Sequence, residues 1–140
     1  MKKLTLPAIG GLLLSSLLLP SALAANLPEG AVVSGGLAWT RNNSTAVGNG
    51  SAAFGLAKQA CDNLTAGGYT DWRLPTKVEL SALSASSKTA LTSAGWTLGN
   101  TWSATPNPNK GSGYLSVVLN NGLVTATGDP YLTHYVSCVR

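Results

Sequence analysis

The sequence predicts a single exported domain of the α+β class, and three local observations support this class. Thr76 and Glu79 form the capping-box pattern that starts a helix. The run over residues 52–66 repeats its apolar positions at helical spacing. Asn121 and Gly122 separate two β-rich runs, which is the strongest short-range signal for a β-hairpin. The chain therefore combines helices with antiparallel strands.

The N-terminus carries the features of a secretory signal peptide. Lys2 and Lys3 precede an apolar run, and small residues at 22–24 form a cleavage site. The apolar core of this run is shorter than the ~20 apolar residues that a membrane helix needs, so a retained anchor is the less favoured alternative. We expect residues 1–24 to be removed. Export then leads to the periplasm, the cell surface or the medium, with no membrane span left.

The mature chain, residues 25–140, comprises 116 of the 140 residues and suits one domain with one core. Loss of Lys2 and Lys3 leaves seven basic residues against five acidic ones, a net charge of +2. A nucleic-acid-binding face needs clustered basic residues. The basic residues of the mature chain are instead dispersed along it: Arg41, Lys58, Arg73, Lys77, Lys88, Lys110 and Arg140. The sequence therefore predicts no nucleic-acid partner.

Both cysteines, Cys61 and Cys138, lie in the mature chain. In an exported protein an isolated pair is most simply a disulfide. A bridge between them closes a long loop and would stabilise the fold by about 4 kcal/mol if the loss of chain entropy is the main effect. The alternative is a pair of reactive thiols, but neither cysteine lies in a CxxC motif.

The first half of the mature chain contains one predicted strand and one predicted helix. Residues 25–36 are small and polar and are expected to be irregular, whereas residues 37–41 alternate as in a short strand. A helix is predicted over residues 52–66 with Ser51 as its cap. The Gly-Gly pair at 67–68 supplies the positive φ that ends this helix. Its apolar face consists of Phe54, Ala57, Cys61 and Leu64.

The stretch from Asp71 to Leu80 is the densest in local signals. Pro75 keeps the residue before it extended, and the capping box begins a helix at Lys77. This helix is expected to weaken around residues 84–87, with one further turn at 90–94. Its predicted buried residues are Val78, Leu80 and Leu83. We interpret the corner as a structural motif made of Trp72, Arg73, Leu74, Pro75, Thr76 and Glu79.

Arg73 is the charged residue of this motif. We expect it to be structural, with its guanidinium bound to backbone carbonyls or to a carboxylate such as that of Asp71. The alternative is that Arg73 binds an anion.

The second half of the mature chain is predicted to be mainly β. A strand over residues 101–104 leads to a loop, residues 105–113, that is rich in proline, asparagine and glycine. The hairpin consists of residues 114–119 and 123–127. A last strand over residues 135–139 is expected to place Val136 and Cys138 on one face and Tyr135, Ser137 and Val139 on the other.

Four segments taken together resemble a known family. They are Gly-Leu-Ala-Trp-Thr (36–40), the Gly-Gly-Tyr-Thr-Asp-Trp-Arg-Leu-Pro-Thr-Lys-Val-Glu-Leu run (67–80), Thr-Trp-Ser-Ala-Thr (101–105) and the final Val-Ser-Cys-Val-Arg (136–140). In this order they resemble the C-terminal domain of the Legionella collagen-like adhesins, and the resemblance spans residues 36–140.

The resemblance implies a C-type-lectin-like fold, with two helices packed on short antiparallel sheets and the chain ends brought together. It also implies binding at a surface, because the adhesins of this family bind sulfated polysaccharides. The sequence departs from those adhesins because it has no collagen-like repeat and because its mature charge is only mildly positive. The first departure removes trimerisation through a collagen triple helix and leaves the oligomeric state open, and the second argues against strong polyanion binding.

Neither a metal site nor a catalytic site is predicted. The loop over residues 105–109 lacks the acid that a calcium-binding lectin loop uses, and the five acids are scattered. His134, the sole histidine, is expected to be structural rather than a general base or a metal ligand. The Arg-Leu-Pro-Thr corner also resembles formylglycine-generating oxidases, but the cysteines are better explained as a structural disulfide. We therefore expect no cofactor.

The remaining candidate for a ligand surface is the loop over residues 103–113 with its surroundings. Irregular loops on a rigid scaffold are where binding residues concentrate. The candidate residues are Trp102, Asn107, Asn109, Lys110, Ser112 and Tyr114. The alternative is a plain connecting loop with Trp102 in the core.

The sequence supports three functional hypotheses. The first is a non-catalytic binding module that contacts a glycan or a cell-surface partner without calcium. The second is a structural or assembly subunit of a surface appendage or envelope complex. The third, disfavoured, is an oxidase related to formylglycine-generating enzymes.

Overall fold

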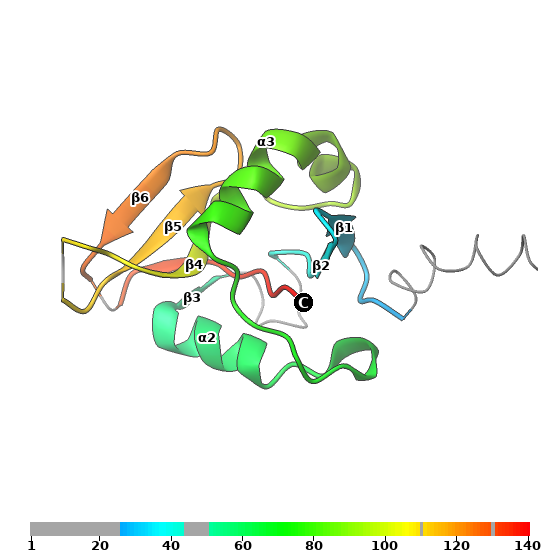
Figure 1. Ribbon diagram of the computed structural model, residues 1–140, viewed down its shortest axis with the longest axis horizontal. Coiled ribbons are helices and arrows are strands. Elements are labelled where there is room, and N and C mark those ends of the chain that lie inside the picture. Colours follow the sequence, from blue (N-terminus) through cyan, green and yellow to red (C-terminus); the bar gives the residue numbers. More distant parts are fainter. Residues whose placement is uncertain (1–25, 44–50, 110, 130) are drawn as a thin grey trace, which may run out of the picture.

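The computed structural model describes residues 26–43, 51–109, 111–129 and 131–140, so the predicted signal peptide lies outside the described residues. Within these ranges, two helices and seven strands confirm the predicted α+β class (Figure 1). The elements in chain order are β1 (Val32–Ser34), β2 (Leu37–Trp39), β3 (Ser51–Ala53), α2 (Phe54–Asp62), the 3₁₀ turn η2 (Ala66–Gly68), α3 (Lys77–Ser93), β4 (Asn100–Pro106), β5 (Tyr114–Val118), β6 (Val124–Thr127) and β7 (Thr133–Tyr135).

The strands form two sheets. β1 and β2 make a small antiparallel hairpin, and the other five strands follow the order β3-β7-β4-β5-β6. Neighbouring strands are antiparallel except β4 and β7, which meet in parallel. The predicted hairpin is present, since β5 pairs with β6 and Val117 lies opposite Val124. β6 therefore forms one edge of the larger sheet (Figure 1).

The buried side chains form two clusters, one associated with each helix. The α2 cluster consists of Ala38, Ala57, Cys61, Trp72, Leu74, Trp102, Val136 and Cys138. The α3 cluster consists of Trp39, Leu80, Leu83, Leu91, Trp96, Val117, Leu119 and Val139. Successive strand residues point to opposite faces, which is why β4 sends Trp102 to one cluster while β5 sends Val117 to the other. Each large side chain fully buried in this way contributes about 1.5–3 kcal/mol.

The predicted disulfide is confirmed, with Cys61 of α2 bonded to Cys138 and Cα atoms 5.3 Å apart. The segment that carries Cys138 lies between two other parts of the chain. Arg140 exchanges backbone hydrogen bonds with Ala38 on one side, and Val139 exchanges them with Arg73 on the other. The chain end is thus held by β2, by the corner and by α2 together.

The last predicted strand is partly wrong. The regular strand is β7, and residues 136–139 lie beyond it. These residues were expected to divide into two faces, but all four are buried. The physical reason is that the segment passes between the two clusters, so Val136 and Cys138 pack into one while Val139 packs into the other.

The first predicted helix begins later and ends earlier than expected. Residues 51–53 form β3, and Ala53 rather than Ser51 precedes the helix, with no side-chain cap. Ala52 pairs with His134, and its carbonyl accepts a hydrogen bond from the Trp102 indole at 2.7 Å. These tertiary bonds override the local helical preference.

The second predicted helix is longer than expected, because α3 continues through residues 84–87. The serine hydroxyls there form hydrogen bonds without displacing the helix's own backbone bonds. Ser84 donates to the Leu119 carbonyl at 2.8 Å, and Ser86 donates to the Ala82 carbonyl at 2.8 Å. Gly95, with φ of 81°, follows the helix. Leu80 and Leu83 are buried as predicted, but Val78 is 70% exposed. Val78 lies in the first turn and points to solvent, so its predicted burial is wrong.

The irregular segment predicted over residues 25–36 contains the strand β1, which sequence reasoning missed. Among the described residues, no helix is long and apolar enough to span a membrane.

Candidate functional site

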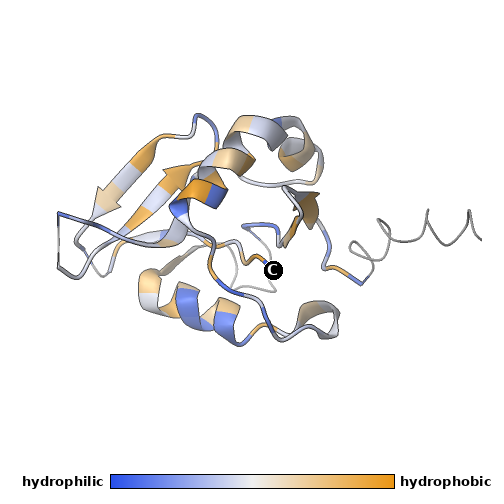
Figure 2. Ribbon diagram, viewed as in Figure 1, coloured by the Kyte–Doolittle hydropathy of each residue, from blue (hydrophilic) through white to orange (hydrophobic). Residues whose placement is uncertain are grey.

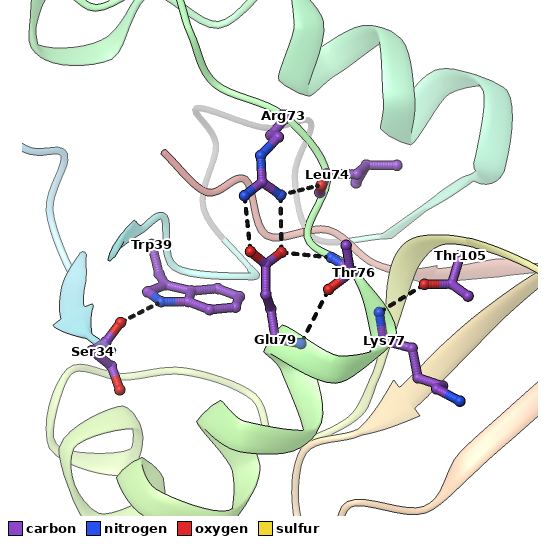
Figure 3. A network of polar contacts seen from close by, with 8 residues as sticks. All are labelled: Ser34, Trp39, Arg73, Leu74, Thr76, Lys77, Glu79 and Thr105. Carbon is purple, nitrogen blue, oxygen red and sulfur yellow. Dashed lines mark hydrogen bonds and ion pairs between the residues drawn. The ribbon is translucent and has the colours of Figure 1, made fainter. Parts of the chain in front are cut away.

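The corner before α3 is built around Glu79 (Figure 3). The predicted capping box is present: Thr76 Oγ1 accepts from the Glu79 N–H at 3.2 Å, and the Thr76 N–H donates to Glu79 Oε1 at 2.8 Å. Arg73 donates to both oxygens of the same carboxylate, at 2.9 and 2.8 Å. These donors, with Arg73 the strongest, lower the pKa of Glu79 from its usual 4.5 to about 2.

Arg73 is therefore held by its surroundings. Its guanidinium also donates to the Leu74 carbonyl at 3.3 Å, as the sequence predicted for a carbonyl partner. The predicted carboxylate partner, Asp71, is wrong, because Glu79 takes that place. The capping box brings Glu79 one helical turn back toward the corner, which puts it within reach of Arg73.

Asp71 instead binds Arg140, with oxygen–nitrogen distances of 2.6 and 3.2 Å. The Arg140 guanidinium also lies over the Tyr69 ring, 3.5 Å from its centroid. Sequence reasoning missed this site. The two residues of the ion pair are 69 positions apart, and no local pattern connects them.

Four rings from α2, β4, β5 and β7 lie in contact, those of Phe54, Trp102, Tyr114 and His134. Phe54 stacks on Tyr114 with centroids 3.5 Å apart and meets Trp102 edge-to-face at 5.6 Å. The His134 ring lies 4.4 Å from the Trp102 ring, measured between centroids. Burial holds the pKa of the His134 imidazole below its usual range.

Trp102 does not offer the aromatic face that the sequence analysis considered for it. Its side chain is 1% exposed and belongs to the α2 cluster, so the alternative of a core tryptophan is the correct one for this residue. Tyr114 is half-buried and remains at the surface beside the loop. The aromatic contact surface therefore consists of Tyr114 and Phe54 rather than Trp102.

The candidate loop has a fixed base. Asn107 is 6% exposed, its backbone N–H bonds the Gly113 carbonyl at 2.8 Å, and its side-chain oxygen accepts from the Asn109 N–H at 3.0 Å. A Cβ on Gly113 would lie 2.2 Å from the Thr127 carbonyl oxygen, so only glycine permits this approach of the loop to β6. Asn107 is thus a structural residue rather than an available ligand donor.

Asn109 and Ser112 are exposed and remain available, whereas Lys110 lies outside the described residues. Two hollows adjoin this loop, and Tyr114 lines both. The first has a mixed polar and apolar lining, made of Pro106, Asn107, Pro108, Asn109, Gly111, Ser112, Gly113 and Tyr114. The second, of about 100 Å³, is lined by Phe54, Gly55, Trp102, Ser112, Gly113, Tyr114, Thr127, Gly128 and Asp129.

Charge is scarce around these hollows. Between Trp96 and Val139, the part of the chain that the structure describes holds one carboxylate, Asp129, and one histidine, His134, but no lysine or arginine. One Asp129 oxygen accepts from the Tyr131 N–H at 2.9 Å. Within the described ranges, no group of three or more His, Cys, Asp or Glu residues is placed to hold a metal ion.

Comparison with known proteins places this architecture in a family. No curated protein matches the chain. The family model described as the Lcl C-terminal domain matches residues 33–140, which is most of the sequence and includes the corner, both cysteines and the candidate loop. The chain belongs to the Lcl C-terminal domain family.

Proposed function

We propose that the mature protein is a non-catalytic surface binding module that contacts an uncharged glycan, without calcium, through Tyr114 and the loop beside it. Membership in the Lcl C-terminal domain family associates the chain with surface adhesins. The observation that carries the proposal is the position of Tyr114, which lines both a hollow of mixed polar and apolar character and an aromatic one.

This combination of groups suits a sugar. A sugar ring has an apolar C–H face that packs on aromatic rings and a hydroxyl rim that needs donors and acceptors. Tyr114 and Phe54 supply the aromatic part, and Asn109 and Ser112 supply an amide and a hydroxyl. The amide can donate and accept at once, as can the hydroxyl, which matches the dual character of sugar hydroxyls.

The charge distribution favours a neutral glycan over a sulfated one. Asp129, which lines the aromatic hollow, would repel a sulfate group. The arginines of the corner do not compensate, because Arg73 is bound to Glu79 and Arg140 to Asp71. A sulfated chain would have to displace these carboxylates to bind there.

Two observations support calcium independence and a lack of thiol-based catalysis: the hydrogen bonding of Asn107 in the loop, and the disulfide in the α2 cluster. Calcium needs six to eight oxygen ligands, whereas the Asn107 oxygen is already bonded to the Asn109 N–H. A thiol-based oxidase needs reactive cysteines, whereas Cys61 and Cys138 are bonded to each other and fully buried.

The test is a glycan array with the purified mature protein, measured with calcium and with a chelator. We expect binding to neutral glycans that is unchanged by the chelator. Asn109→Ala and Tyr114→Ala should each weaken binding by roughly 10-fold, the equivalent of about 1.4 kcal/mol. The matched control is Asn63→Ala, an exposed asparagine at the end of α2. Binding only to sulfated glycans, or equal losses in the control, would contradict the proposal.

A further inference from the structure

We propose that the aromatic hollow beside the loop binds the acetamido group of an N-acetylated amino sugar, so that the glycan recognised contains N-acetylhexosamine. This assignment rests on the proposed function and names the sugar that the proposed function leaves open. Four features of the hollow support it: its size, its apolar lining, a free acceptor oxygen on Asp129 and a glycine, Gly55, in its wall.

The hollow is too small for a whole sugar ring. Its volume of about 100 Å³ corresponds to roughly three water molecules. A substituent of a few non-hydrogen atoms fills such a space, and an acetamido group has this size. Ser112, Gly113 and Tyr114 line both this hollow and the larger one next to it. A sugar ring on Tyr114 can therefore direct one substituent into the aromatic hollow while its hydroxyl groups face the other.

The lining suits the methyl end of an acetamido group better than a cation. A cation needs an open ring face, but Phe54 and Tyr114 cover one face of each other at 3.5 Å and Trp102 is 1% exposed. Burial of a methyl group is favourable in any orientation. The end of α2 that borders the hollow is apolar (Figure 2), and its first charged residue, Lys58, is bound to Asp62 at 2.5 Å.

Asp129 supplies an acceptor for the amide N–H. Its Oδ1 accepts from the Tyr131 N–H at 2.9 Å, and its own backbone N–H donates to Thr127 Oγ1 at 3.0 Å. These bonds hold the carboxylate in the wall of the hollow, while its Oδ2 has no hydrogen-bond partner within the described ranges. An ionised carboxylate only accepts, so the ligand must bring a donor. The acetamido N–H is such a donor and adds no charge to a neutral glycan.

Gly55 keeps one wall of the hollow open. It lies in the first turn of α2, where glycine is less favourable than alanine. Its φ is not positive, and a Cβ at this position would meet no atom within 4 Å. Neither the backbone conformation nor close packing therefore requires a glycine here, whereas space for a ligand does.

Calorimetric titration of the mature protein with matched oligosaccharides tests the assignment. The ligands have equal length and linkage and carry an acetamido, a hydroxyl or an amino group at C2, in both the gluco and the galacto series. In at least one series we expect the acetamido form to bind about 10-fold more tightly than the hydroxyl form, and more tightly than the amino form.

The outcomes separate this assignment from the proposed function. Equal binding of the acetamido and hydroxyl forms in both series overturns the assignment and leaves the proposed function standing. Tightest binding of the amino form overturns the assignment as well, because the hollow would then be a cation site. Absence of binding to every neutral oligosaccharide overturns the assignment and the proposed function together.

Two variants test the hollow itself. Asp129→Asn keeps an oxygen for the Tyr131 N–H but replaces Oδ2 with a donor, so it should abolish the preference for the acetamido form. Glu29→Gln makes the same change at an exposed position outside the hollow and should keep the preference. Gly55→Leu fills the hollow and should weaken binding of the acetamido form about 10-fold, with a smaller loss for Gly55→Ala.

Circular dichroism checks that each variant is folded. Gly55→Leu places a stronger helix former at an exposed helical position, so it keeps the assignment testable if Asp129→Asn does not fold. A wild-type preference for the acetamido form in every folded variant of these two residues overturns the assignment.

Discussion

The two sides of this domain use polar groups in opposite ways. At the corner and the chain end, the charged side chains are bound to one another, Arg73 to Glu79 and Arg140 to Asp71. At the hairpin and the described part of its loop, charge is nearly absent, and the exposed polar groups of Asn109 and Ser112 border hollows. The difference teaches that the most distinctive sequence motif holds the fold together, while the candidate binding surface lies in an inconspicuous loop.

The largest expected effect concerns the buried Trp102 side chain, which belongs to the α2 cluster. Trp102→Ala should destabilise the protein by about 3–5 kcal/mol, because it removes a fully buried tryptophan and its indole hydrogen bond to Ala52. Urea unfolding measures the change. Tyr114→Ala is the matched variant and should cost clearly less stability, since Tyr114 is half-buried. Equal losses of unfolding free energy in the two variants would mean that Tyr114 is also a core residue, which would contradict its assignment to the ligand surface.

Removal of the disulfide is the next largest effect. The double variant Cys61→Ala with Cys138→Ala should lose about 2–5 kcal/mol, because the unfolded chain gains freedom when the bridge between α2 and the chain end is absent. Unfolding of the oxidised wild type and the variant by guanidinium gives the difference. An unchanged midpoint would show that β2 and the corner hold the chain end without the bridge.

Two variants, one at the corner and one in the loop, should affect stability and glycan binding in opposite ways. Thr76→Ala should lose about 1 kcal/mol of stability through loss of the helix cap, while its folded fraction keeps glycan binding. Asn109→Ala should show the reverse, with stability unchanged and binding reduced. Calorimetry and glycan binding on both proteins complete the comparison. Selective loss of binding in a fully stable Thr76→Ala protein would move the site to the corner.

The smallest effect is a pH dependence at Glu79. Its pKa is about 2 in the folded protein against 4.5 normally, so its stabilisation is fully present above pH 4.5 and is lost as the pH falls toward 2. We expect a loss below about 1 kcal/mol, because Arg73 is 47% exposed and the pair is screened. The wild type should therefore lose more stability than Glu79→Gln over this range in urea titrations. Parallel curves for the two proteins would contradict this assignment.

Local signals predicted much of the scaffold. The capping box at Thr76, the hairpin at Asn121-Gly122 and the buried Leu80 and Leu83 are all present. Each depends on residues within a few positions of one another, so local sequence patterns are sufficient to predict it. The disulfide was predictable for another reason, since a chain with two cysteines offers a single intramolecular pairing.

Predictions failed where distant segments compete for the same residues. Ala52 was expected to be helical, but it pairs with His134 in a strand and bonds Trp102, 50 positions away. For Arg73 the expected carboxylate partner is the nearby Asp71, but the helix cap places Glu79 at its guanidinium while Arg140 binds Asp71.

By itself, the sequence determined the class of the fold, the start of α3, the hairpin and the identity of the bridged cysteines, because short-range sterics and pairing rules are sufficient for these. Only the tertiary structure decided which charges neutralise one another, that Trp102 is fully buried while Tyr114 is half-buried, and that β6 forms an edge of the larger sheet. These properties arise from contacts between residues far apart in the chain. The free energy of such contacts depends on how the whole sheet is assembled.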